Sequence, residues 1–72
     1  MQEYIYEDIS SPDLDQIHLD IVSSDMDDKS IEYCRWDENP VDEHLENCLH
    51  IVFTNELSQD DKTKLDNIIS AL

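Results

Sequence analysis

The sequence predicts an α+β fold: a small antiparallel sheet of three or four strands with one C-terminal amphipathic helix packed on it. Residues 16–54 contain short runs of β-forming residues separated by polar connections, and residues 58–72 repeat apolar side chains at helical spacing. Seventy-two residues leave room for one domain, so we expect residues 1–72 to fold as a single unit. Residues 1–15 are polar and are expected to be its least ordered part, a loose arm.

The first half of the chain holds two expected β segments. Residues 3–9 favour a short strand or an arm, and a Ser-Ser-Pro-Asp sequence ends this segment because proline fixes φ and lacks a backbone donor. Further along, Ile17, Leu19 and Ile21 alternate with polar side chains. Alternation of this kind predicts a half-buried strand over residues 16–22.

Two more strands follow a connection rich in aspartate and serine. Residues 30–37 alternate between two faces, one with Ile31, Tyr33 and Arg35 and the other with Cys34 and Trp36. An Asn-Pro pair ends this strand, and residues 41–47 are either an acidic loop or a single helical turn. Residues 48–54 form the strongest strand, with one face made of Leu49, Ile51 and Phe53 and the other of Cys48, His50, Val52 and Thr54.

Residues 58–72 carry a complete helix signal. Ser58 is a natural N-cap, and Asp61 three residues later completes a capping pattern. Asp60 and Lys64 are spaced as a stabilising i, i+4 ion pair. A helix of this length is marginal alone, so its apolar stripe must pack on the sheet. The expected core is therefore Ile17, Leu19, Ile21, Leu49, Ile51, Phe53, Leu65, Ile68, Ile69 and Leu72.

The composition excludes several classes of function. Nineteen acidic residues against four basic ones give a net charge of -15, so too few cations are present to neutralise phosphates. We therefore expect no direct binding to nucleic acid and none to a membrane. The N-terminus lacks the basic and apolar regions of a secretion signal. The chain also has no glycine, which removes phosphate-binding loops and the tight turns that present backbone N–H groups to an oxyanion.

Three side chains suggest metal or nucleophile chemistry, but their spacing does not support it. Cys48 and His50 share one side of a strand, and Cys34 lies on a neighbouring one. Zinc sites carry paired cysteines or histidines at short fixed spacings, and no such pair is present. The aspartate-rich stretches also lack the glycine and the glutamate of a calcium loop. We expect free thiols, no metal, no cofactor and no enzymatic activity.

Aromatic and β-branched residues are the candidates for a protein interface. In a domain this small, such side chains belong either to the core or to the anchors of a contact surface. We expect Trp36 to belong to the core, because so small a domain needs every large apolar side chain there. If Trp36 is not in the core, its face of the strand needs a partner protein to cover it. The interface candidates are Tyr4, Tyr6, Tyr33, Trp36 and Val52.

The C-terminal third carries a further pattern: an apolar strand ending in phenylalanine, then Leu-Ser, two acids, Lys-x-x-Leu-Asp and two apolar residues. The residues that carry it are Phe53, Leu57-Ser58, Asp60-Asp61, Lys62, Leu65-Asp66 and Ile68-Ile69. Over residues 49–69 this resembles a strand–turn–helix module of small virion proteins of tailed bacteriophages, which are tail, fibre, neck or head components. The resemblance implies an assembly protein of the virion, made in the host cytoplasm, that contacts other virion subunits or itself.

Acidic residues are concentrated ahead of this module. Residues 1–46 hold 15 acids and two bases, whereas residues 47–72 hold four acids and two lysines. One alternative function is a DNA mimic that inhibits a basic nucleic-acid-binding or defence protein of the host. The other interpretation is a solvated face that keeps the chain soluble. The candidate acids are Asp13, Asp15, Asp20, Asp25, Asp27, Asp28, Glu32, Asp37, Glu38, Asp42, Glu43 and Glu46.

Overall fold

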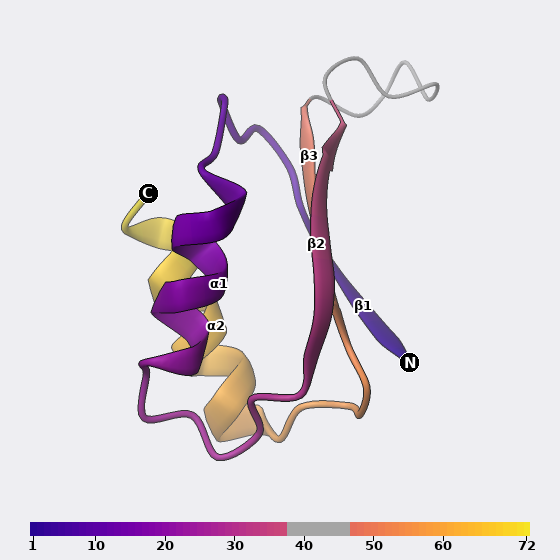
Figure 1. Ribbon diagram of the computed structural model, residues 1–72, viewed down its shortest axis with the longest axis vertical. Coiled ribbons are helices and arrows are strands. Elements are labelled where there is room, and N and C mark those ends of the chain that lie inside the picture. Colours follow the sequence, from indigo (N-terminus) through magenta and orange to yellow (C-terminus); the bar gives the residue numbers. More distant parts are fainter. Residues whose placement is uncertain (38–46) are drawn as a thin grey trace.

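The computed structural model describes residues 1–37 and 47–72. Within these residues the chain forms a sheet layer and a helix layer (Figure 1). The elements, in chain order, are β1 (Gln2–Tyr6), α1 (Leu14–Val22), β2 (Ile31–Asp37), β3 (Cys48–Phe53) and α2 (Gln59–Ser70). The α+β class, the antiparallel sheet and the C-terminal helix are confirmed, and the sheet has three strands.

The apolar strand β3 lies at the centre of the sheet. It pairs antiparallel with β1 on one side and with β2 on the other, giving the order β1-β3-β2. β1 and β2 therefore run parallel to each other, and α1 connects them across β3, an arrangement known as split β-α-β. Both helices lie over the same face of the sheet (Figure 1). The opposite face is left without a helix or strand from the described residues.

The strand expected around Ile17, Leu19 and Ile21 is wrong, because this segment is the helix α1. Asp13 is its N-cap, and the Asp13 carboxylate accepts a hydrogen bond from the backbone N–H of Gln16 at 3.1 Å. Ile17 and Ile21 lie one helical turn apart, so both are buried, whereas Leu19 points to solvent. A spacing of two residues fits a strand and a spacing of four fits a helix. The Asp13 cap supports the helix.

The N-terminal segment is a strand and not an arm, since β1 pairs with β3 along its whole length. Beyond β1, Asp8 adopts the left-handed φ of 58°. The chain then returns to the sheet, where the N–H of Ile9 donates to the carbonyl of Asn47 at 3.1 Å. Aspartate is one of the few residues besides glycine that enters this region readily, so it serves here in a chain that has no glycine.

A β-bulge changes which side chains of β2 face the helices. The register with β3 shifts between Ile31 and Tyr33. Ile31 consequently packs against the core together with Cys34 and Trp36. The expected grouping of Ile31 with Tyr33 and Arg35 is wrong, because an extra residue in a strand reverses the alternation on one side of the bulge.

α2 begins as expected but uses its acids differently. Ser58 is the N-cap, and its hydroxyl accepts the N–H of Asp61 at 3.2 Å. The Asp61 side chain does not complete the capping box; it bonds to the loop before β2 instead. The expected pairing of Lys64 with Asp60 is also replaced, since the Lys64 ammonium lies 3.6 Å from the Asp25 carboxylate and 3.1 Å from its carbonyl oxygen.

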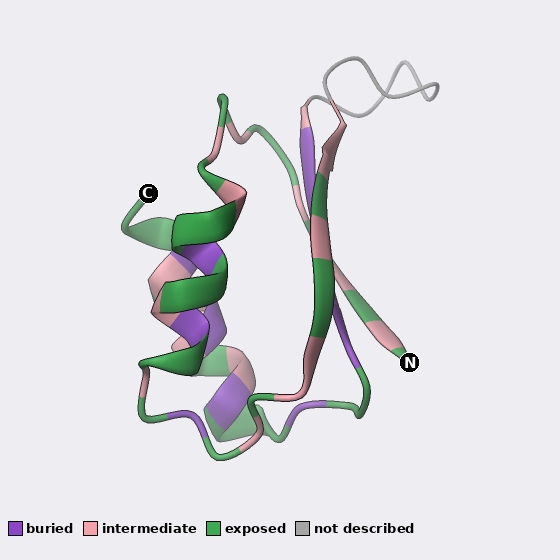
Figure 2. Ribbon diagram, in the orientation of Figure 1, coloured by how far each residue is buried: buried purple, intermediate pink, exposed green. Residues whose placement is uncertain are grey.

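The core lies between the sheet and the two helices (Figure 2). Ile68 is partly buried at its margin. Leu19 and Leu72 were expected in the core but are each 56% exposed, because Leu19 is on the outer side of α1 and Leu72 follows the C-cap of α2. Met26 and Leu57, which lie in loops outside any periodic pattern, are buried instead. The expected core residues that are buried are Ile17, Ile21, Leu49, Ile51, Phe53, Leu65 and Ile69.

Candidate binding surfaces

The sheet face opposite the helices, here called the uncovered face, has an apolar centre. Its central residue is Val52 on β3, which lies opposite Glu3 on one side and Tyr33 on the other. Ile5 and Tyr33, on the two outer strands, are 50% and 48% exposed. Tyr33 lies beside Val52, and Ile5 lies opposite His50, the neighbouring residue of β3 on this face. These half-exposed apolar side chains form a surface that a second protein could cover.

A row of charged and polar side chains crosses the three strands on the same face. The His50 ring lies between two carboxylates, with Nδ1 3.4 Å from Glu3 Oε2 and Nε2 3.2 Å from Asp37 Oδ2. Arg35 Nη1 then contacts the same Asp37 oxygen at 2.8 Å. His50 is only 8% exposed, and its Nδ1 forms no hydrogen bond within the described structure. The row ties the outer strands to β3 on the uncovered face.

The two cysteines lie on opposite faces of the sheet. Cys34 faces the helices, where its thiol lies 3.6 Å from the carbonyl of Leu14, and Cys48 is on the face of His50. They are not joined by a disulfide. Burial raises the pKa of both thiols, and nearby acids such as Asp15 and Glu7 raise it further, so neither is activated as a nucleophile. Over residues 1–37 and 47–72, no three metal-binding side chains converge on one point.

Most aromatic interface candidates belong to the core of the domain itself. Tyr4 packs edge-on against Phe53, with ring centroids 5.9 Å apart, and its hydroxyl accepts the N–H of Leu57 at 2.8 Å. Trp36 also packs on the core, and its indole N–H donates to the carbonyl of Ile9 at 2.9 Å. Of the five candidates, Tyr33 and Val52 lie on the uncovered face.

Tyr6 takes part in a polar cluster that fastens β1 to α2. Its hydroxyl donates to Asp66 at 2.7 Å, and Lys62 contacts both Asp66 and the Tyr6 hydroxyl. The Lys62 ammonium also lies over the rings of Tyr4 and Tyr6, 5.6 and 5.2 Å from their centroids. Burial, then the bond to Asp66, raises the pKa of Tyr6, so its proton stays in place. The cluster therefore links the edge strand β1 to α2 through side-chain contacts.

The loop between α1 and β2 (residues 23–30), here called the acidic loop, is anchored by a buried carboxylate. Asp61 is 1% exposed, and its two oxygens accept the backbone N–H groups of Asp27 and Asp28, each at 2.9 Å. The Asp28 side chain in turn accepts bonds from Ser30, which lower the pKa of Asp28. The Asp27 side chain is exposed to solvent on this loop. The sequence reasoning missed this role of Asp61, because its position also suits a cap.

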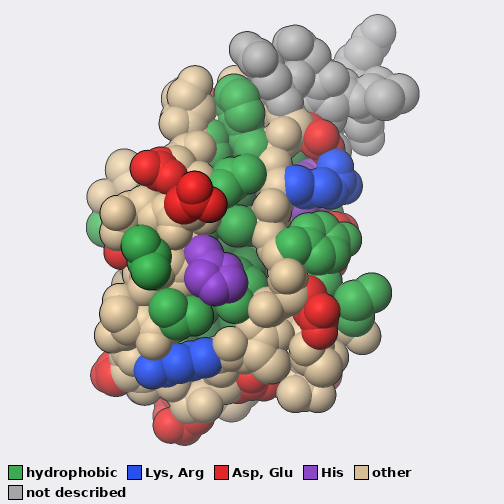
Figure 3. Space-filling model, in the orientation of Figure 1, with side chains coloured by type: hydrophobic (Ala, Val, Ile, Leu, Met, Phe, Trp, Pro, Cys, Tyr) green, Lys and Arg blue, Asp and Glu red, His purple; other side chains and the backbone are tan. Residues whose placement is uncertain are grey.

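The remaining acidic candidates are dispersed. Figure 3, which views α1 and β2, has acidic side chains over both elements and hydrophobic side chains in the seam between them. Asp13 and Asp15 are exposed at the start of α1. On β2, Glu32 is exposed and bonded to Thr54, and Asp37 belongs to the charged row. Outside the described residues lie Glu38, Asp42, Glu43 and Glu46.

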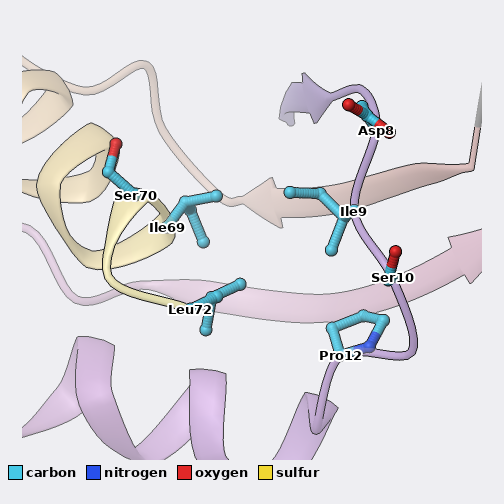
Figure 4. Close-up of a pocket in the computed structure, with 7 residues that line it drawn as sticks. All are labelled: Asp8, Ile9, Ser10, Pro12, Ile69, Ser70 and Leu72. Carbon is cyan, nitrogen blue, oxygen red and sulfur yellow. The ribbon is translucent and has the colours of Figure 1, made fainter.

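A pocket of about 410 Å³ lies at the C-terminal end of α2 (Figure 4). Ile9 and Ile69 point toward one another across it, the first from the loop between β1 and α1 and the second from α2. No local sequence pattern indicates this pocket, since Ile9 and Ile69 lie far apart in the chain. Its lining residues are Asp8, Ile9, Ser10, Pro12, Ile69, Ser70 and Leu72.

No protein-family model matches the chain, and no curated protein or solved structure matches it either. Neither of the helices in the described part is long and apolar enough to cross a membrane.

Proposed function

We propose that this chain is a non-enzymatic assembly module that binds a neighbouring protein subunit through the uncovered face of its sheet. The observation that carries the proposal is the half exposure of Ile5 and Tyr33 on the two strands that flank β3. Interfaces commonly combine apolar and polar side chains, and here the row from Glu3 to Arg35 supplies polar groups beside the apolar ones. The resemblance of residues 49–69 to bacteriophage virion proteins supports a place in the tail, neck or head of a virion.

The charge of the chain favours a different subunit over a second copy as the partner. Each copy brings a net charge of -15, and two such copies repel each other at short range. A less acidic subunit escapes this repulsion. We therefore expect the purified chain to be monomeric alone and to enter a complex when its partner subunit is present.

The proposal is tested by placing a charge at one of the half-exposed apolar residues of the uncovered face. The Ile5→Lys variant should reduce the amount of chain recovered in purified virions at least tenfold, because lysine cannot be buried there unpaired. Leu19→Lys is the matched control, since Leu19 is similarly exposed but lies on α1, and it should be recovered as the wild type is. Equal recovery of both variants, or a wild-type chain absent from virions, would contradict the proposal.

A second candidate function is inhibition of a basic nucleic-acid-binding protein by mimicry of DNA. The observation that favours it is the fixed conformation of the acidic loop, which the buried Asp61 holds through the backbone of Asp27 and Asp28. Carboxylates held in advance lose less entropy on binding than those of a mobile segment.

Salt separates the two functions. A complex made through the acidic loop should weaken steeply between 50 and 300 mM NaCl, and Asp25→Asn with Asp27→Asn should reduce its affinity while Ile5→Lys leaves it unchanged. A complex made through the uncovered face should lose affinity with Ile5→Lys and keep it with Asp25→Asn and Asp27→Asn. Its affinity should depend little on salt. The affinity of a captured partner protein for the immobilised wild-type and variant chains, measured over this range of salt, gives both the salt dependence and the effect of each substitution.

A further inference from the structure

The pocket at the end of α2 has a suitable size for a small ligand or a long side chain, and four of its seven lining residues are apolar. Ile9, Pro12, Ile69 and Leu72 supply the walls (Figure 4). Its volume of about 410 Å³ is within the range of small-molecule sites, about 300–1,000 Å³. Leu72 is largely exposed at the rim, so an occupant that covered it would gain apolar contact.

The pocket is also electrostatically negative. Asp8 is one of its lining residues, and none of the lining residues is basic. The C-terminal end of α2 forms the other side, and the helix dipole places a partial negative charge at that end. α2 has no basic residue in its last turn to offset this charge. A cation is therefore favoured over a neutral group or an anion.

The loop that frames the pocket is strained but firmly attached. Asp8 and Ser11 have φ angles of 58° and 42°, in the region that glycine normally occupies. Backbone conformations of this kind are found more often at binding sites. Ile9 fixes the loop between them, because its N–H bonds to Asn47 and its carbonyl accepts the indole N–H of Trp36. The pocket is thus formed before any ligand arrives.

We propose that this pocket binds a lysine side chain from another protein. The four-carbon stem would lie against the apolar walls, and the ammonium would pair with Asp8 near the C-terminal end of α2. Arginine suits the site less well, because no aromatic ring lines the pocket for a guanidinium to stack on. The site goes beyond the function proposed above and uses a different surface, formed by α2 and the β1–α1 loop.

The test uses two small probes that share one stem: Nα-acetyl-lysine N-methylamide and its neutral counterpart Nα-acetyl-norleucine N-methylamide. Methyl NMR signals of Ile9, Ile69 and Leu72 report binding. The lysine probe should bind at least fivefold more tightly than the norleucine probe. Equal affinities, or shifts spread over other surfaces, would overturn the proposal. A third probe, n-pentylamine, separates a free amine from a protein side chain, and tighter binding by n-pentylamine would overturn the assignment to a protein.

Variants separate the charge from the stem. Asp8→Asn should abolish the preference for lysine while keeping the backbone, since asparagine tolerates a left-handed φ. Glu7→Gln removes an exposed acid that does not line the pocket, and it should keep the preference. Leu72→Ala should weaken both probes alike. Ile5→Lys, which tests the uncovered face, should bind the lysine probe as the wild type does, so the two proposals fail independently.

Discussion

At the residue scale, Asp61 shows how one side chain can serve a distant segment. Its position three residues after Ser58 is typical of a carboxylate that caps its own helix. The structure directs it to two backbone N–H groups that lie more than 30 residues earlier in the chain. Full burial makes this contact important, because a buried carboxylate must have its oxygens satisfied.

We expect Asp61→Asn to lower the free energy of unfolding by about 2–3 kcal/mol, because the amide NH2 would face a backbone N–H that has lost its acceptor. Asp60→Asn is the matched control: it also removes a first-turn charge, but from an exposed side chain, and should cost at most about 0.5 kcal/mol. Urea denaturation measures both variants. Similar losses in the two would mean that helix dipole effects alone explain the role of Asp61.

Asp66 makes stability depend on pH in the acid range. Hydrogen bonds from Lys62 and then Tyr6 lower the pKa of Asp66 below the ordinary carboxyl value of about 3.9. A lowered folded-state pKa stabilises the fold above the ordinary value, and this contribution is lost as pH falls through the lowered one.

Asp66→Asn should therefore cost about 1 kcal/mol at pH 7, a modest loss because the site is partly exposed to solvent. The difference from wild type should shrink below about pH 4. Denaturation at a series of pH values checks this. Tyr6→Phe removes one of the two donors and should weaken the pH dependence, whereas a constant difference at all pH values would contradict the assignment.

At the scale of elements, α1 shows why a short apolar alternation is ambiguous. Ile17, Leu19 and Ile21 would share a face in a strand, but a helix turns Leu19 away from the other two. The N-cap at Asp13 and the bond between Gln16 and Asp20 at 2.8 Å support the helix locally. Packing against β2 and α2 then selects it.

A pair of substitutions distinguishes the two conformations in solution. Ile17→Ala should reduce the free energy of unfolding by about 2–4 kcal/mol, because it empties a buried site. Leu19→Ala should change it by less than about 0.5 kcal/mol, because Leu19 is exposed and alanine favours a helix. Chemical denaturation measures the two values, and equal losses would indicate that both side chains share a buried strand face.

At the scale of the whole molecule, the net charge of -15 opposes compaction. Nineteen acids confront four bases, so repulsion between carboxylates exceeds the attraction in the few ion pairs. Three of the basic residues pair with a carboxylate: Lys62 with Asp66, Lys64 with Asp25, and Arg35 with Asp37. Salt screens both kinds of interaction, and the more numerous repulsions should dominate.

The melting temperature should consequently rise by several degrees when NaCl increases from 20 to 500 mM, since about 1 kcal/mol shifts the melting temperature of a domain this size by about 4–8 °C. Differential scanning calorimetry measures the shift. Equal osmolarity of sucrose is the control for effects unrelated to charge. A fall in melting temperature with salt would mean that the ion pairs outweigh the repulsion.

The binding surfaces were harder to predict from the sequence than the helices and strands were, because the surfaces depend on tertiary contacts. Tyr4, Tyr6 and Trp36 have the composition of interface anchors, yet their hydroxyl and indole groups bond within the domain. The pocket joins Ile9 to Ile69, and no local pattern connects two residues so far apart. Sequence spacing indicates which side chains share a face; it does not indicate which elements will cover that face.

Local sequence patterns were enough to predict the apolar strand over residues 48–54, the C-terminal helix with its Ser58 cap, and the excess of acid. These features follow from short-range causes: an apolar run, a capping hydroxyl and a count of charges. Tertiary structure decided that residues 14–22 are a helix, that Asp61 holds a loop, and that both helices cover one face of the sheet. Those outcomes depend on contacts between segments that are distant in the chain, where burial and hydrogen bonding outweigh local preference.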